Sequence, residues 1–95
     1  MKDLRKLAKG QPCQVRLFGV CNHNDETTVL AHVRIAGISG MGMKSPDLIG
    51  AWCCSSCHAV VDGQQASALS REERMLALAE GVFRTQAQLI RKGLI

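Results

Sequence analysis

Apolar positions recur at helical spacing in a short segment near the start of the sequence. In "KDLRKLAK", residues 2–9, Leu4, Leu7 and Ala8 fall on one face of a helix, and charged side chains cover the rest. Gly10 follows, and glycine readily adopts the left-handed conformation that ends many helices. This pattern predicts a short N-terminal helix.

The last third of the chain shows the same spacing over a longer stretch. Ser70 and Glu73 form a capping box, which predicts where a helix begins. The positions that we expect to face the core after it are Met75, Ala79, Val82, Phe83, Gln86, Leu89 and Ile90. We therefore expect a long amphipathic helix over about residues 70–92, with a purely structural role.

The middle of the chain has shorter apolar runs that favour strands. "TTVLAHV", residues 27–33, is the best strand candidate, and "DLIGAW", residues 47–52, is a second one. "CQVRLFGVC", residues 13–21, is strand-like with a bend at Gly19, whereas the glycines of "RIAGISGMGMKSP", residues 34–46, exclude a regular element. "HAVVDG" predicts a short helix that stops at Gly63. The fold class is therefore α+β.

Composition limits how such a chain is stabilised and where it works. Only Phe18, Trp52 and Phe83 are aromatic among 95 residues, so the apolar core is thin and a metal cross-link would help. A net charge of +4 favours a polyanionic partner without proving one. With charged first residues and no long apolar run, we expect a cytoplasmic protein without a membrane span. Thiols stay reduced in that compartment, so five cysteines suggest metal ligands or reactive thiols before disulfides.

Two cysteine pairs predict a structural zinc site. Cys54 and Cys57 have the C-x-x-C spacing that lets two thiolates reach one tetrahedral ion, and Cys13 and Cys21 supply a second pair. A thioredoxin-like redox pair needs a larger α/β domain, and two metal-free buried pairs are the other alternative. Cys53 would need the poorer C-x-x-x-C spacing, so we expect it to be a buried neighbour of Trp52.

The chain also resembles a family of nucleases. A strand with His32, a glycine-rich loop, a strand opened by Asp47 and a C-x-x-C-H leading into a helix together resemble the HNH (His-Me finger) endonucleases. The chain is more closely similar to the YbcO-type prophage nucleases. The stretches that carry this similarity are "CQVRLFGVCN", "ETTVLAHVRIAG", "GMKSPDLIGAWCCSSCH" and "RTQAQLIRKGLI", which together extend over nearly the whole chain.

The resemblance implies a fold and an activity. It implies one zinc-containing ββα-metal domain (HNH, treble-clef-like) over residues 1–95, with its core at about residues 13–63. The implied activity is metal-dependent hydrolysis of phosphodiester bonds in DNA, with His32 as general base and Asp47 and His58 beside the ion. Asp62 lies four residues after His58 on the same helical face and is a further candidate ligand. The ion would be magnesium or a transition metal. Ala31 departs from the pattern, because many HNH enzymes place an aspartate before the base histidine.

Several positions keep a structural alternative, and so does the function. His32 can be a structural histidine, His58 a zinc ligand, Asp47 the end of a turn and Asp62 polarity at a helix end. Basic side chains expected to contact DNA phosphates are Arg16, Arg34 and Lys44. The alternative function is a non-catalytic zinc-binding module that binds DNA or a protein. The sequence leaves open whether the chain forms a homodimer.

Overall fold

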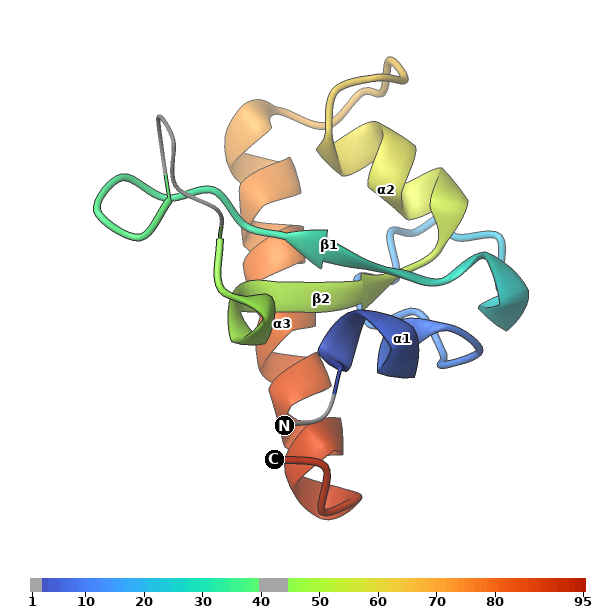
Figure 1. The fold of residues 1–95 in the computed structure, drawn as a ribbon. Coiled ribbons are helices and arrows are strands. Elements are labelled where there is room, and N and C mark those ends of the chain that lie inside the picture. The colour runs from blue at the N-terminus through green and yellow to red at the C-terminus, as the bar shows by residue number, and fades with distance from the viewer. Residues whose placement is uncertain (1–2, 40–44) are drawn as a thin grey trace.

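The computed structural model describes residues 3–39 and 45–95. Over these residues it has an α+β fold with a two-stranded sheet and three α-helices, so the predicted fold class is confirmed (Figure 1). The order of the elements is α1 (Leu4–Ala8), β1 (Val29–His32), β2 (Gly50–Cys53), α2 (Ser55–Val61) and α3 (Arg71–Arg91). Two 3-10 turns, Asp25–Thr27 and Asp47–Ile49, precede the strands.

The two strands form an antiparallel ladder that separates two apolar clusters. Leu30 lies opposite Trp52, and Ala31 lies opposite Ala51. Because side chains alternate along a strand, Trp52 and Leu30 pack with α1 and the last turns of α3, whereas Ala31 and Ala51 pack with α2 and the first half of α3. The hairpin is therefore covered from several directions by helices (Figure 1).

Helix α3 lies against the edge of β2 that β1 leaves open. The backbone N–H of Trp52 donates a 2.9 Å hydrogen bond to Thr85 Oγ1, and the Trp52 carbonyl accepts one of 2.7 Å from the N–H of Gln14. Gly81 allows the close approach, because a Cβ there would lie 2.8 Å from Val15 Cγ2. The backbone N–H and carbonyl of Trp52 at this edge thus bond to a side chain and a loop instead of to a third strand.

The start of α3 and the ends of all three helices agree with the sequence prediction. The capping box of Ser70 and Glu73 is present in both directions, and α3 ends at Arg91. Gly10 and Gly63 have positive φ angles just after α1 and α2, as expected of residues that end helices. No helix in the described residues is both long and apolar enough to cross a membrane.

Four expectations about individual elements were wrong. Residues 13–21 form turns and not a strand, because the amides of Val20 and Cys21 bond back to the Leu17 carbonyl. Residues 47–49 form a 3-10 turn, so the second strand begins only at Gly50. Helix α2 begins at Ser55, three residues before the predicted start.

The fourth correction concerns the buried face of α3. Val82 and Leu89 are buried as predicted, but Phe83 and Ile90 are 69% and 66% exposed, and Met75 is also exposed. The face towards β2 is instead made by Leu78, Gly81, Val82, Thr85 and Leu89. A glycine and a threonine take core positions there because the strand lies too close for larger side chains.

The hydrogen bond between Trp52 and Thr85 is directly testable. Thr85→Val keeps the side-chain volume but leaves the buried Trp52 amide unpaired, which should cost about 1–3 kcal/mol in the free energy of unfolding. Urea denaturation followed by tryptophan fluorescence measures this. Thr85→Ser is the control, because it keeps the hydroxyl and loses only a methyl group worth about 1 kcal/mol. A serine variant as unstable as the valine variant would contradict a role for the hydroxyl.

Candidate functional site

Four cysteine sulfurs from two distant parts of the chain converge at one point. They belong to Cys13, Cys21, Cys54 and Cys57, and all lie within 4.8 Å of one another. The Sγ atoms of Cys21 and Cys54 are 3.8 Å apart. Sulfurs that bind one tetrahedral ion at a bond length of about 2.3 Å lie roughly 3.8 Å apart, so the set can hold a metal ion. The predicted grouping of these four cysteines is therefore confirmed.

Backbone amides support the sulfurs of both pairs. Cys54 is the N-cap of α2, and its Sγ accepts a 3.4 Å hydrogen bond from the N–H of Cys57. Cys13 Sγ accepts one of 3.5 Å from the N–H of Arg16, in a turn where Arg16 has a φ of 55°. Amides directed at sulfur favour the thiolate, which is the form that binds metals.

The fifth cysteine lies beside this cluster. Cys53 is fully buried, as expected, but it packs with Cys13, Cys54 and Cys57, on the side of β2 opposite to Trp52. Hydrogen bonding with the sulfurs of Cys13 and Cys57, together with burial, raises the pKa of the Cys53 thiol. The same contacts lower the pKa of Cys13, its contact with Cys53 most of all. The surroundings of Cys53 thus disfavour its thiolate form.

A histidine, a carboxylate and an arginine meet at the other end of the hairpin. His32 ends β1 and lies opposite Gly50, so the turn before β2 brings Asp47 beside it. His32 Nε2 lies 2.8 Å from Asp47 Oδ1, and Arg5 Nε from α1 lies 3.4 Å from the same oxygen. The hydrogen bond from His32, with the charge of Arg5, lowers the pKa of Asp47 despite its partial burial. Asp47 is therefore a carboxylate that orients the imidazole.

The second histidine has a separate carboxylate partner. His58 Nε2 lies 3.0 Å from Asp62 Oδ2, across one turn of α2. In residues 3–39 and 45–95, the four-cysteine cluster is the one group of three or more potential ligands whose atoms converge on a common point. The structure therefore pairs His32 with Asp47 and His58 with Asp62, but it does not gather Asp47, His58 and Asp62 into one ligand set.

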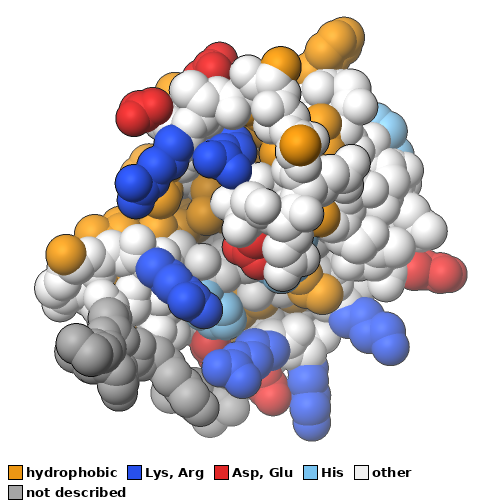
Figure 2. All heavy atoms as spheres, turned by 90° about the horizontal axis from the view of Figure 1, so that it is seen from above, with side chains coloured by type: hydrophobic (Ala, Val, Ile, Leu, Met, Phe, Trp, Pro, Cys, Tyr) orange, Lys and Arg blue, Asp and Glu red, His pale blue; other side chains and the backbone are white. Residues whose placement is uncertain are grey.

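The basic side chains that were expected to contact DNA differ in their surroundings. Figure 2, which shows the molecule from above the view of Figure 1, has Lys and Arg side chains spread over the left and lower parts of this face, with histidine and acidic side chains near some of them. Arg34 is exposed two residues after His32. Arg16 is exposed, yet its guanidinium donates to the Cys13 carbonyl at 3.3 Å and to Gln14 Oε1 at 3.0 Å, which ties it to the cysteine loop. Lys44 lies outside the described residues.

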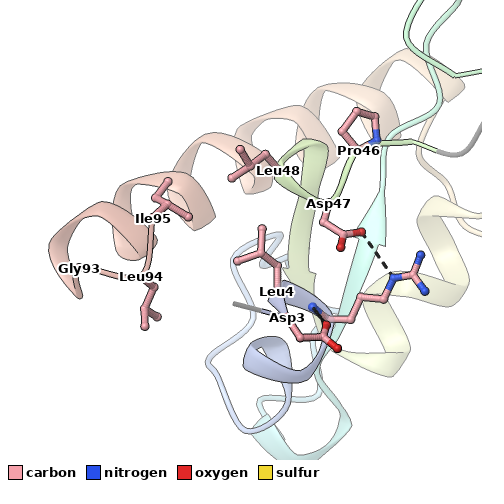
Figure 3. A pocket seen from close by; sticks show the side chains of 9 residues that line it. Asp3, Leu4, Pro46, Asp47, Leu48, Gly93, Leu94 and Ile95 are labelled. Atoms are coloured by element: carbon pink, nitrogen blue, oxygen red, sulfur yellow. Dashed lines mark hydrogen bonds and ion pairs between the residues drawn. The ribbon is translucent and has the colours of Figure 1, made fainter. Parts of the chain in front are cut away.

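A hollow of about 940 Å³ opens next to Asp47. Leu4, Leu48, Leu94 and Ile95 line its apolar part, and Asp47 stands at one side (Figure 3). Arg5, which is paired with Asp47, also lines the hollow. Arg5 is the site residue that the sequence analysis did not select. Its position in an ordinary basic helix gave no sign that it would reach the carboxylate of Asp47, in the turn before β2.

The fold and the cysteine cluster define a small α+β protein with a candidate metal centre. The chain belongs to the YbcO family, whose model, described as "Putative nuclease YbcO", matches residues 2–94. It is 47% identical over 95 residues to "Putative nuclease YbcO" of Escherichia coli (strain K12), covering all of this chain and 98% of that protein. The "Putative nuclease ybcO" of Enterobacteria phage 82 matches with the same identity and coverage.

A solved structure has the same fold. It is described as "Structure of a putative bacteriophage protein from Escherichia coli str. K-12 substr. MG1655" and superposes with a TM-score of 0.80 at 41% identity. The match covers 96% of this chain and all of the other. The fold described above is therefore that of a phage-associated family.

The cysteine cluster predicts a measurable metal content. Purified protein should contain about one tightly held metal ion per chain, and Cys54→Ser should lose most of it because one of four ligands is gone. Elemental analysis with a thiol titration measures both. Cys53→Ala is the matched control and should keep the ion, because its sulfur is outside the ligand set. Equal metal content in both variants would contradict this assignment.

The contacts of Asp47 predict how its carboxyl group titrates. Because its pKa is lowered in the folded protein, the stabilisation by this group is present above the pKa of the unfolded chain, about 4, and is lost as pH falls through the folded value. NMR titration of the side-chain carboxyl should show a midpoint below that of an ordinary aspartate. In His32→Ala the midpoint should rise towards it. An unchanged midpoint would show that the hydrogen bond is absent in solution.

Proposed function

We propose that this protein is a metal-dependent DNA endonuclease of the HNH type that hydrolyses phosphodiester bonds. The observation that carries the proposal is the 2.8 Å contact between His32 and Asp47, formed between the end of β1 and the turn before β2. The order hairpin then helix, with the cysteine pair at the start of α2, supports a ββα-metal core within a single domain of residues 1–95. The relatives described as nucleases support the reaction class.

The hydrogen bond suits His32 to act as a general base. A carboxylate can only accept, so Asp47 selects the tautomer in which Nε2 carries the proton. The other nitrogen, Nδ1, then has a free lone pair that can take a proton from a water molecule. Histidine that is held by a carboxylate in this way is also better able to carry the positive charge that follows.

His58 and Asp62 are the proposed ligands of the catalytic ion, together with Asp47. Both contacts of Asp47 described above use Oδ1. The three residues do not converge on one point, and His58 already contacts Asp62. His58 and Asp62 must therefore give up their mutual contact before they can bind an ion. A magnesium or transition-metal ion bound there would neutralise the phosphate and the developing alkoxide. Imidazole among the ligands favours a transition metal.

The cysteine cluster is proposed to hold a structural zinc ion. Four thiolates make a closed tetrahedral site with no position for a substrate, which is typical of structural zinc. The cluster joins the loop of residues 13–21 to the start of α2, which carries His58. The proposed zinc would therefore set where the second histidine lies.

DNA is the proposed substrate, and charge attracts it. Arg34 stands close to His32 along the chain, and Arg5 lies within 3.4 Å of Asp47. Such side chains bind phosphates without reading sequence, and the binding weakens steeply as salt rises. We propose that Arg16 contributes mainly by bracing the cysteine loop, because its guanidinium is engaged there.

One observation favours a second function, a non-catalytic zinc-binding module that binds DNA or a protein. His58 is already paired with Asp62, and the proposed ligands of the catalytic ion do not converge. Ala31 also supplies no ligand before His32. A protein that had kept the cysteine cluster and lost the second ion would have these features.

A cleavage assay separates the two functions. Plasmid DNA incubated with magnesium, manganese, nickel or zinc should be nicked by the wild-type protein, and His32→Ala should lose at least about 100-fold in rate because the general base is gone. His23→Ala is the control, because that exposed histidine has no proposed catalytic role. Its Nδ1 lies 3.8 Å from Cys21 Sγ, so the variant must contain as much metal as the wild type. If the protein binds DNA but does not cleave it with any of the four metal ions, the non-catalytic module would be favoured. Equal cleavage by His32→Ala would exclude His32 as the base.

A further inference from the structure

Helix α3 carries a row of large apolar side chains on the surface of the molecule. Leu76, Phe83 and Ile90 are 61%, 69% and 66% exposed. They are spaced seven residues apart, and seven residues make almost two helical turns, so they form one stripe along the helix. The stripe is about 21 Å long at 1.5 Å per residue. Ala79 and Ala87 lie between its members on the same face.

This stripe is separate from the face that α3 packs on the protein. The buried residues Leu78, Val82 and Leu89 point towards β2 and the apolar clusters. The stripe therefore contributes nothing to the core described above. Single exposed apolar residues are common, but three large ones in a row along one helix mark an interaction surface.

We infer that the stripe is the interface of a homodimer, in which α3 of one chain packs antiparallel to α3 of a second copy. Phe83 lies midway between the other two residues. A twofold axis at Phe83 therefore places Leu76 of each chain against Ile90 of its partner, and the stripe is complementary to itself. Seven-residue spacing of apolar side chains is the repeat that lets two helices pack along a shared seam.

Charges beside the stripe select the antiparallel arrangement. The exposed charges on its side of the first half of α3 are acidic, namely Glu72, Glu73 and Glu80, whereas the exposed charge in the last turn is Arg91. Antiparallel packing brings Arg91 of one chain near Glu73 of the other, whose carboxylate keeps its charge while Oε1 accepts the capping hydrogen bond from the Ser70 N–H. Parallel packing would instead place the acidic first half of one helix along the acidic first half of the other, with the two Arg91 side chains at the same level. Arg84 takes no part, because its Nε donates to the Gln14 carbonyl at 2.7 Å.

The interface is a narrow one, so the dimer should dissociate on dilution. It does not depend on the proposed nuclease function, since no residue of the stripe belongs to the candidate site. A protein that lacks cleavage activity would still be expected to dimerise.

Sedimentation velocity from about 1 to 500 µM tests the inference. The wild-type protein should pass from the 10.3 kDa monomer to a species of twice that mass as concentration rises. Phe83→Glu should raise the dissociation constant by roughly 30-fold or more, because it places two charges at the centre of the interface. Phe18→Glu is the control, because Phe18 is fully exposed and does not belong to the stripe, and it should dimerise like the wild type.

The orientation has its own test. Arg91→Glu puts an acid opposite Glu73 only in the antiparallel dimer, so it should weaken association several-fold at low salt. Unchanged or tighter association would overturn the antiparallel arrangement. A wild-type chain that stays monomeric throughout the concentration range would overturn the inference and assign the stripe to a different partner. A dimer that survives Phe83→Glu would overturn it as well, and circular dichroism of each variant verifies that the fold is intact.

Discussion

The convergence of four cysteine sulfurs is the constraint on which the arrangement of this small protein depends. Cys13 and Cys21 lie in a loop without regular structure, and Cys54 and Cys57 lie at the start of α2. The two-stranded hairpin is enclosed between these pairs along the chain. A two-stranded sheet is only marginally stable by itself. Tying its flanks together at one point holds α2 over the hairpin and leaves α3 to close the edge of β2.

The candidate site uses the opposite end of the same hairpin. His32 and Asp47 are joined because β1 ends where the turn before β2 begins, and Arg5 is added from a helix outside the hairpin. The histidine of α2 has its own carboxylate, Asp62. The protein thus holds two histidine–carboxylate pairs on separate elements. One pair is placed by the end of β1 and the turn before β2, whereas the other is placed by the helix that the cysteine cluster positions.

Local signals predicted most of the elements and the cysteine grouping, but long-range packing decided the rest. The capping box, the glycines after helices and the C-x-x-C spacing act over a few residues, so Ser70, Gly63 and Cys54 could be interpreted directly. The burial of Thr85 and the exposure of Phe83 could not, because they depend on how closely α3 approaches β2. Arg5 was missed for the same reason, because it contacts Asp47 although the two residues are far apart in the sequence.

The spacing of the cysteines also bears on the order in which a growing polypeptide becomes structured. During synthesis, all four cysteines lie outside the ribosome once residue 57 has emerged. At that moment no residue of α3 has emerged. An ion captured at this stage would lock the hairpin and α2 together while β2 still has an open edge. The last helix would then arrive on a prepared surface, and the exposed edge strand would be covered before it meets another nascent chain.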